Sequence, residues 1–233
     1  MSAAAASLSP DQPPDLAVLR ERMQRMAGGM PRVPVSMHPA LSGVVQLYAG
    51  ASYEVDGLGL AMALLAGPSR AGEWCAVVGI PDFGAEAAAE TGVELARTVL
   101  VPEPGEQWLE VTAALVDVTP VVLLRPGGRV APSVAERLGA RLRKRSAVLL
   151  VQGDWPRSEA RIGVEEPAWS GLGQGHGHLR ARRVAVTVRR GTAPARGTDL
   201  WLPDPAAGVR RATPEAVPIT AARNAAPDSR EAG

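Results

Sequence analysis

A strand, a glycine-containing turn and a helix follow one another between residues 44 and 66, the arrangement that holds nucleotide phosphates in a phosphate-binding loop. That chemistry needs backbone N–H groups curled around the phosphates, a lysine on the β- and γ-phosphates, and a Ser or Thr hydroxyl on Mg²⁺. The turn contains Gly50, Gly57 and Gly59, but Leu58 and Gly59 stand where the lysine and the hydroxyl are required. The sequence therefore predicts a degenerate phosphate loop, with the right setting and without the reactive side chains.

The acidic residue that should hold magnesium is also missing. It is expected at the end of a later strand, yet the apolar run at residues 121–124 is followed by Arg125. Glu54 and Asp56 would repel phosphates, because the loop has no cation to offset them. Lys144 is the single lysine among 25 Lys and Arg residues, and it lies far along the chain. We therefore expect no bound cofactor, no catalytic residue and no enzymatic activity.

Metal and thiol chemistry have few residues available, since the chain has three histidines and one cysteine. His176 and His178 have the His-x-His spacing of a chelate, but glycines flank them and no Cys or third His is near in sequence. We interpret that segment as a plain loop, so no metal site is predicted. Cys75 lies within an apolar run and is interpreted as a small buried hydrophobe.

Composition limits the remaining classes of function. The 233 residues carry 25 basic and 24 acidic side chains, for a formal net charge of +1, so we expect no whole-surface attraction to nucleic acid. No run of about 18 apolar residues is long enough to cross a membrane. The N-terminus lacks the basic start and apolar core of a signal peptide, and one cysteine cannot form an internal disulfide. We expect a cytoplasmic protein without membrane contact.

Short apolar runs alternate with helical patterns from residue 41 onward. The runs predicted as strands are residues 44–48, 74–78, 99–101, 121–124 and 147–151, and the predicted helices are residues 58–66, 86–95, 105–116 and 132–144. Apolar runs of four or five residues separated by helices are typical of parallel strands covered on both faces. The sequence predicts an α/β fold, a three-layer sandwich with a mostly parallel sheet.

The segments outside this alternation set the predicted domain boundaries. Residues 1–40 are interpreted as a disordered lead followed by an N-terminal helix that Asp15 caps and Gly28 ends. Residues 41–202 form the core domain, in which a glycine-rich loop precedes a strand at residues 184–188, and residues 199–202 pair with that strand as a C-terminal hairpin. Residues 203–233 lack periodicity and are predicted as a mostly disordered tail, which could order on binding a partner.

Two sets of side chains are candidate contact surfaces. Five arginines follow the glycine-rich stretch with no acidic residue among them, and they are candidates for contact with DNA or a partner: Arg180, Arg182, Arg183, Arg189 and Arg190. Trp169 and Trp201 lie beyond the last predicted core strand and are candidate partner anchors. A solvated basic face and ordinary packing of the tryptophans stay open as alternatives.

Several segments, taken in order, resemble the ATPase core of RecA. They are Val-Val-Gln-Leu-Tyr at residues 44–48, Trp-Cys-Ala-Val-Val at 74–78, Gly-Val-Glu at 92–94, Pro-Gly-Glu-Gln at 104–107, and Leu-Arg-Ala-Arg-Arg-Val at 179–184. Four further segments are similar to actinobacterial RecA-like mutagenesis accessory proteins of the ImuA-prime type: Leu-Leu-Ala-Gly-Pro at 64–68, Trp-Cys-Ala-Val-Val-Gly at 74–79, Leu-Leu-Arg-Pro at 123–126, and Leu-Trp-Leu-Pro at 200–203. The chain is identified as a member of that family, a degenerate relative of RecA.

The resemblance implies which functional positions are lost. The phosphate-binding Lys and Thr of RecA fall on Leu58 and Gly59, and its magnesium Asp falls on Arg125. Its catalytic Glu falls near Pro81, where Asp82 is the nearby carboxylate. Its nucleotide-sensing Asn-Gln falls on residues 152–153, where Gln152 keeps a polar group.

The resemblance also implies a function and partners. It implies a non-catalytic role in SOS mutagenesis and translesion DNA synthesis after DNA damage. The chain would bind a Y-family polymerase-like mutagenesis protein and act indirectly with an error-prone DnaE-type polymerase. The alternatives are a SulA-like cell-division inhibitor and an ATP-dependent DNA recombinase. Direct contact with DNA and self-association stay open.

Overall fold

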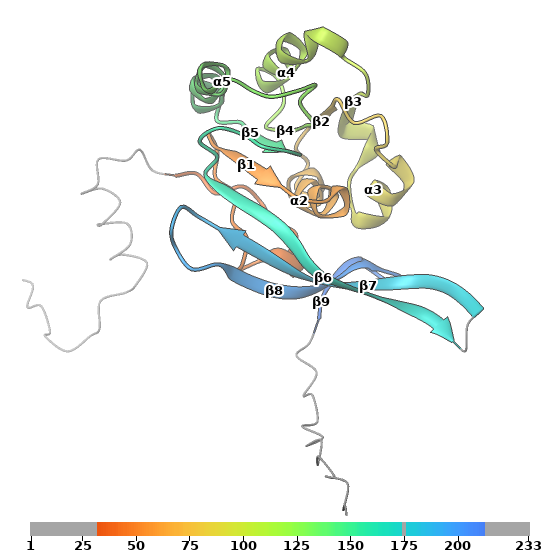
Figure 1. Cartoon of the computed structure of the whole chain (residues 1–233). Helices are drawn as coiled ribbons and strands as arrows, with labels where there is room; N and C mark the ends of the chain where they lie inside the picture. The colour runs from red at the N-terminus through yellow and green to blue at the C-terminus, as the bar shows by residue number, and fades with distance from the viewer. Residues whose placement is uncertain (1–31, 174–175, 213–233) are drawn as a thin grey trace, which may run out of the picture.

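A computed structural model describes residues 32–173 and 176–212 of the chain (Figure 1). The helix predicted to begin at Asp15 lies outside these residues, as does the predicted tail beyond residue 212. The side chains of His176 and His178 also lie outside the described part.

The described residues contain four α-helices, three 3-10 turns and nine strands. The helices are α2 (Leu58–Arg70), α3 (Ala85–Thr91), α4 (Trp108–Val116) and α5 (Pro132–Arg145), and the turns are η1 (Pro39–Leu41), η2 (Leu95–Arg97) and η3 (Gly105–Gln107). The strands are β1 (Ser52–Val55), β2 (Cys75–Val78), β3 (Thr98–Val101), β4 (Val121–Leu124), β5 (Val148–Val151), β6 (Ala160–Gly173), β7 (His176–Arg189), β8 (Arg196–Asp204) and β9 (Gly208–Arg211).

The nine strands form one mixed sheet in the order β3-β2-β4-β5-β1-β6-β7-β8-β9. Strands β3 to β6 of that order pair in parallel, and β6 to β9 continue as antiparallel neighbours. The predicted α/β fold with a mostly parallel sheet is confirmed. The predicted C-terminal hairpin is confirmed too, since Val186 of β7 lies opposite Thr198 of β8.

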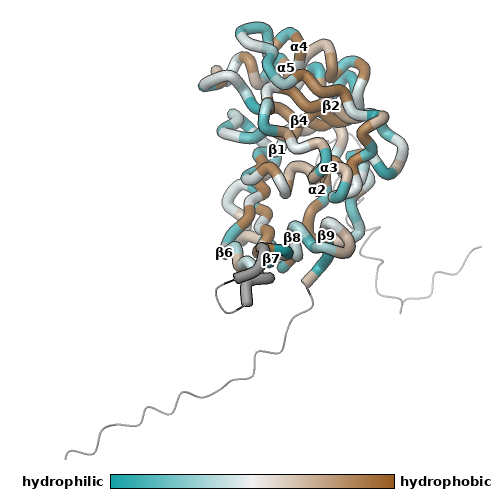
Figure 2. The backbone as a smooth tube through the Cα atoms, turned by 90° about the vertical axis from the view of Figure 1, so that its right-hand side faces the viewer, coloured by the Kyte–Doolittle hydropathy of each residue, from teal (hydrophilic) through white to brown (hydrophobic). Residues whose placement is uncertain are grey.

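Helices cover both faces of the parallel part, which explains its apolar runs. Every residue of β2, β4 and β5 is buried, and successive side chains point to opposite faces. Val77 and Leu123 pack in the core that contains α2 and α3, whereas Val78 and Leu124 pack in the core that contains α4 and α5. Figure 2 accordingly shows β2 and β4 in the brown of apolar residues.

Helix α2 is enclosed on all sides. Ten consecutive residues, 60–69, are buried, as expected of a helix without a polar face. Figure 1 shows α2 between the parallel strands and the antiparallel ribbon of β6 to β9, which bends beneath it. Val184 of β7 and Leu200 of β8 belong to the same core as α2. The sheet thus wraps around this helix.

The first strand differs from the prediction. Residues 44–48 were predicted as a strand, but there the structure has only an isolated bridge between Pro34 and Tyr48. Val45 and Leu47 are buried in irregular chain, so their apolar character reflects burial alone. The strand is β1, in which Tyr53 and Val55 are buried and alternate with Ser52 and Glu54. That period of two was the signal for β1 in the sequence.

The glycine-rich segment also differs from the prediction. Residues 160–173 were predicted as part of a loop, yet they form β6, which pairs antiparallel with β7. The register shifts between Glu165 and Ala168 and between Ser170 and Leu172, so the ladder accommodates irregularities. Pairing with a regular partner strand overrides the weak strand preference of glycine.

The folded part extends beyond both predicted boundaries of residues 41 and 202. Before residue 41, His38 is buried, and Val35 and Met37 pack against the core. After residue 202, β8 continues to Asp204, and β9 adds a ninth strand. Residues 32–40 and 203–212 therefore belong to the domain rather than to a lead and a tail.

Asp204 holds the turn between β8 and β9, and its replacement should be destabilising. Its side chain is 4% exposed and accepts hydrogen bonds from the N–H groups of Ala206 and Ala207 (3.1 Å each) and from Arg210 Nε (2.9 Å). Burial alone would raise the pKa of Asp204, but these three donors together lower it. We expect Asp204→Asn to reduce the free energy of unfolding by about 1–2 kcal/mol at neutral pH in urea titrations.

The pH dependence of this difference follows from the lowered pKa. The ionised form stabilises the fold above the unfolded pKa of Asp, and the contribution is lost as pH falls through the lower, folded pKa. The gap between wild type and Asp204→Asn should therefore narrow on acidification. Asp154→Asn is the matched control, because its side chain is 97% exposed, and it should change stability by less than about 0.5 kcal/mol. If Asp204→Asn and the wild type had equal stability at neutral pH, the hydrogen bonds of Asp204 would not stabilise the turn between β8 and β9.

Candidate functional site

The connection between β1 and α2 is too short to hold phosphates. Only Asp56 and Gly57 separate the two elements, and Gly57 has φ +86° as the first residue before the helix. A phosphate loop places six residues between its first glycine and its Ser or Thr hydroxyl, so two residues cannot curl around a phosphate. Leu58 packs against the core, and Asp56 is exposed. The connection from β1 to α2 therefore lacks the length of a phosphate loop as well as its reactive side chains.

Gly50 does not take part in this connection. It lies before β1, whereas Gly57, Leu58 and Gly59 lie after it, so the strand separates the glycines that were predicted to share one loop. Gly50 has φ +82° and packs against Arg143: a Cβ at Gly50 would lie 3.2 Å from the Arg143 Cα. Gly59 instead faces the guanidinium of Arg182, whose Nη2 would lie 3.4 Å from a Cβ at Gly59.

Three polar side chains meet at the carboxyl ends of neighbouring parallel strands. Arg125 follows β4, Asp82 follows the turn after β2, and Gln152 follows β5. Arg125 pairs with Asp82, its Nη2 donating to Asp82 Oδ2 at 3.3 Å in addition to a shorter Nη1 contact. The Nε and Nη2 of Arg125 also donate to Gln152 Oε1, at 3.2 and 2.8 Å. The hydrogen bond from Arg125 holds the pKa of Asp82 below its ordinary value.

This network bridges the place where α/β sheets usually bind ligands. After β2 the chain enters α3 on one face of the sheet, and after β4 it enters α5 on the other face. A crevice opens at such a reversal, outside the carboxyl ends of the two strands. Here the guanidinium of Arg125 lies at this reversal and contacts both Asp82 and Gln152. Asp82, Arg125 and Gln152, which the sequence analysis identified one by one, are therefore in contact with one another.

Glu54 has a structural task beside this network. Its Oε1 accepts hydrogen bonds from the Trp155 N–H (3.2 Å) and from Ser158 Oγ (3.0 Å), and Oε2 lies 3.7 Å from Arg161 Nε. A hollow of about 790 Å³ adjoins it, and its lining includes Gln152 and Arg129. Glu54 thus fixes the segment after β5 and also lines the hollow.

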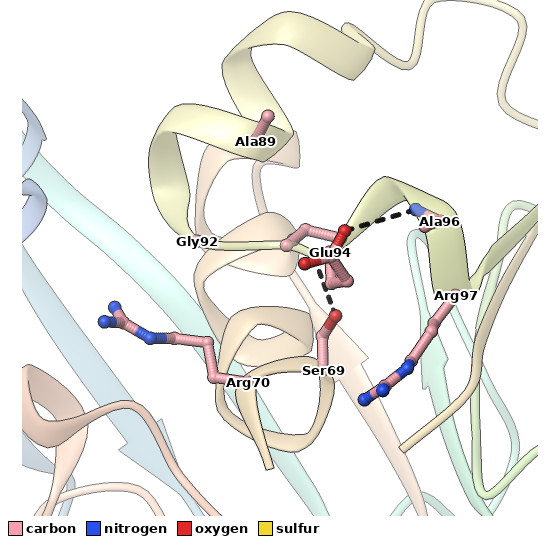
Figure 3. Close-up of a pocket in the computed structure, with 8 residues that line it drawn as sticks. Ser69, Arg70, Ala89, Gly92, Glu94, Ala96 and Arg97 are labelled. Atoms are coloured by element: carbon pink, nitrogen blue, oxygen red, sulfur yellow. Dashed lines mark hydrogen bonds between the residues drawn. The ribbon is translucent and has the colours of Figure 1, made fainter. Parts of the chain in front are cut away.

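A second hollow lies near the end of α2 (Figure 3). The Glu94 N–H donates to Ser69 Oγ (2.8 Å), and Glu94 Oε1 accepts from the Ala96 N–H (3.4 Å). Arg70 and Arg97 extend from separate elements at its rim, as Figure 3 shows. Its lining combines these two arginines with Glu94 and Ser69.

Partner strands supply acidic residues to the predicted arginine surface. Arg183 Nη2 donates to Asp199 Oδ2 (2.7 Å), and Arg189 Nη2 donates to Glu165 Oε1 (2.9 Å). Sequence inspection missed both acids because they lie on β8 and β6, outside the arginine-rich stretch. Arg190 Nη2 donates to the Gln46 carbonyl (2.9 Å). Arg180 is exposed. The surface is thus less positive than its sequence indicates, which weakens the support for DNA contact.

The two predicted anchor tryptophans differ in accessibility. Trp169 on β6 is 49% exposed, and the guanidinium of Arg182 lies 5.4 Å from its ring centroid. Arg182 Nε also donates to the Leu202 carbonyl (2.8 Å), which fixes it over the ring. Trp201 is partly buried, with Arg210 at 5.8 Å from its ring. Trp169 is the tryptophan of this pair that presents its ring to solvent.

Other reactive groups are not brought together. Among residues 32–173 and 176–212, no three His, Cys, Asp or Glu side chains gather as metal ligands. Burial raises the pKa of the Cys75 thiol to about 12, which makes it a poor nucleophile. Within the same residues, no helix has the length and apolarity needed to cross a membrane.

The chain is similar to a described protein family and to a mycobacterial protein. A family model described as the MT3502 N-terminal domain matches residues 40–157. An uncharacterized protein of Mycobacterium tuberculosis (strain ATCC 25618 / H37Rv), Rv3395c, is 35% identical over 153 residues, which cover 63% of this chain and 71% of the relative. The matched domain contains β1 to β5 and the three residues of the Arg125 network, and it ends before the ribbon of β6 to β9.

Proposed function

The chain belongs to the family of the MT3502 N-terminal domain, and we propose that it is a non-catalytic, RecA-like accessory protein in damage-induced translesion DNA synthesis. The observation that carries the non-catalytic part is the contact of Arg125 with Asp82 and Gln152. An arginine in this position opposes a metal ion by charge and fills its space. The two-residue connection from β1 to α2 supports the same conclusion.

The proposed RecA-like character rests on the order of the segments that resemble RecA. Residues 74–78 fall on β2, residues 104–107 on the turn before α4 and residues 179–184 within β7, in an alternating arrangement that suits such a core. Residues 44–48 and 92–94 lie outside the helices and strands. The mycobacterial relative supports the actinobacterial part of the assignment, and the ImuA-prime part rests on the resemblance of the sequence segments. The proposed partner is a Y-family polymerase-like mutagenesis protein, through which an error-prone DnaE-type polymerase acts indirectly.

Calorimetry with Mg-ATP tests the non-catalytic proposal. The full chain should show no magnesium-dependent heat of ATP binding, and it should not hydrolyse ATP with or without single-stranded DNA. Tight binding that requires magnesium would overturn the proposal and favour an ATP-dependent recombinase. Arg125→Asp is an informative variant: if it also fails to bind, the short connection after β1 blocks nucleotide by itself.

Capture experiments from DNA-damaged cells test the proposed partner. A tagged full chain should recover a Y-family polymerase-like protein. Recovery of a tubulin-like division protein instead would favour the SulA-like alternative and reject the translesion role. Undamaged cells provide the comparison for damage dependence.

Trp169 is the residue whose loss should weaken capture most. Exposed tryptophans flanked by arginine are the residue types that dominate binding energy at protein interfaces, and Trp169 has Arg182 over its ring. We expect Trp169→Ala to reduce capture of the polymerase-like partner about tenfold or more. Trp74→Ala is the matched control, since Trp74 is also 49% exposed but lies before β2, and capture should be unchanged. Equal losses of capture in the two variants would show that the partner does not bind at the ribbon of β6 to β9.

A further inference from the structure

The two edge strands of the sheet are protected to different degrees. At one edge, β9 carries two arginines; Arg210 pairs with Asp204, and Arg211 Nη2 donates to the Ser42 carbonyl (2.5 Å). At the other edge, β3 has the sequence Thr-Val-Leu-Val and carries no charge. Charged side chains are a common device that keeps an edge from pairing with another strand. Among the described residues, no strand pairs with the outer side of β3, so this edge presents an unguarded pairing surface.

The register with β2 fixes which backbone groups point outward. The Gly79 N–H donates to the Val101 carbonyl (2.9 Å), so the polar groups of Val101 face β2. Successive residues of a strand point their N–H and C=O groups to opposite sides. Val99 therefore also faces β2, whereas Thr98 and Leu100 direct their N–H and C=O groups to the free edge.

Exposed apolar side chains occur on this edge strand and on the chain just before three of the parallel strands. Leu100, in the middle of β3, is 41% exposed. Trp74, Leu95 and Val118 are also exposed, and they shortly precede the neighbouring strands β2, β3 and β4.

We propose that β3 is a homodimer interface, in which it pairs antiparallel with β3 of a second copy about a twofold axis at Leu100. Twofold pairing with outward-facing groups opposite one another requires an axis through a residue, and an axis at Leu100 or at Val99 pairs the most residues of β3 with those of the second strand. The Leu100 axis sets Leu100 against Leu100 of the second copy. Just beyond the ends of β3, it brings Arg97, the last residue of η2, next to Glu103 of the other copy. The Val99 axis sets the same charged residues against Val101 and Leu95.

Charge complementarity therefore selects a second copy as the occupant. Arg97 and Glu103 are both exposed and lie three residues on either side of Leu100. In an antiparallel twofold dimer, Arg97 of each copy faces Glu103 of the other copy, so two opposite-charge pairs form. An interface between identical surfaces requires this kind of self-complementarity. The hydrogen bonds of Glu94 to Ser69 and Ala96 fix the turn that delivers Arg97 to the start of β3 (Figure 3). The proposal does not depend on the proposed function.

Sedimentation of the full chain over a concentration series tests the dimer. The wild type should show a reversible monomer–dimer equilibrium. Leu100→Lys places like charges opposite each other at the axis and should raise the dimer Kd at least about tenfold. Leu179→Lys is the matched control, because Leu179 is 51% exposed on β7, and its Kd should equal that of the wild type. A wild type that is monomeric throughout the series would overturn the proposal.

Charge exchange tests the register and the identity of the occupant. Arg97→Glu and Glu103→Arg should each raise the Kd about tenfold, since each turns both cross-strand pairs into like-charge pairs. The double variant R97E/E103R restores opposite pairs and should return the Kd to near the wild-type value. Failure of the double variant to recover, with both single variants weakened, would reject the Leu100 axis. Circular dichroism of each variant confirms folding, and the exposed positions make loss of the fold unexpected.

Discussion

Replacing Gly67 by alanine should lower the stability of the protein by about 2 kcal/mol, although alanine is the better helix former. Gly67 lies near the end of α2, where residues 36–38 cross the helix. A Cβ at Gly67 would lie 2.6 Å from the Ser36 carbonyl oxygen and 2.6 Å from the His38 nitrogen, which are backbone atoms that cannot rotate away. Overpacking of this kind costs about 3 kcal/mol, and the helix preference of alanine offsets about 1 kcal/mol of it.

The matched control is Gly139→Ala in α5. There a Cβ would meet only the flexible guanidinium of Arg143, with Nη1 at 3.5 Å. Helix preference should then dominate and stabilise the protein by about 0.5–1 kcal/mol. In thermal unfolding, Gly67→Ala should lower Tm by roughly 4–8 °C and Gly139→Ala should raise it slightly. If Gly67→Ala raised Tm as Gly139→Ala does, residues 36–38 would not press on α2.

The parts of the fold that sequence predicts well are those governed by burial on both faces. The runs at β2, β4 and β5 stand out because every residue in them is buried, and α2 is apolar all round because the sheet encloses it. The prediction of a strand at Val45 and Leu47 was wrong because these residues are buried without forming a strand. Their side chains meet the same core, and sequence does not distinguish irregular buried chain from a short buried strand.

For the candidate site, the sequence predicted the positions of the residues but not the contacts between them. Resemblance placed Asp82, Arg125 and Gln152 one at a time, and a parallel sheet with its carboxyl ends at one edge brings them into contact. Their mutual hydrogen bonds depend on rotamers and turn lengths that no local pattern encodes. The pairing of Arg183 with Asp199 depends on the register of β7 and β8, which is a property of the fold.

The last ten described residues were missed for a related reason. Pro203 and the alternating small and charged residues after it read as tail, because β9 has four residues and only Val209 of them is buried. What holds β9 is long-range: Asp204 caps the turn, and Gly208 lies against the end of α3. A short strand stabilised by such contacts leaves little periodicity to read.

Gly208→Ala should therefore be more destabilising than an ordinary turn substitution. Gly208 has φ +65°, and a Cβ there would lie 2.8 Å from the Glu90 carbonyl carbon and 2.9 Å from the Thr91 Cα, both in α3. The left-handed backbone costs alanine about 1 kcal/mol, and overlap with the helix backbone adds about 2 kcal/mol. Gly191→Ala separates the two effects, since Gly191 has φ +52° with nothing within 4 Å, and it should lose only about 1 kcal/mol. Urea unfolding that gives equal losses for the two variants would mean that β9 is not pressed against α3. A larger loss for Gly208→Ala identifies residues 203–212 as part of the cooperative unit, because strain between β9 and α3 lowers global stability only when both unfold together.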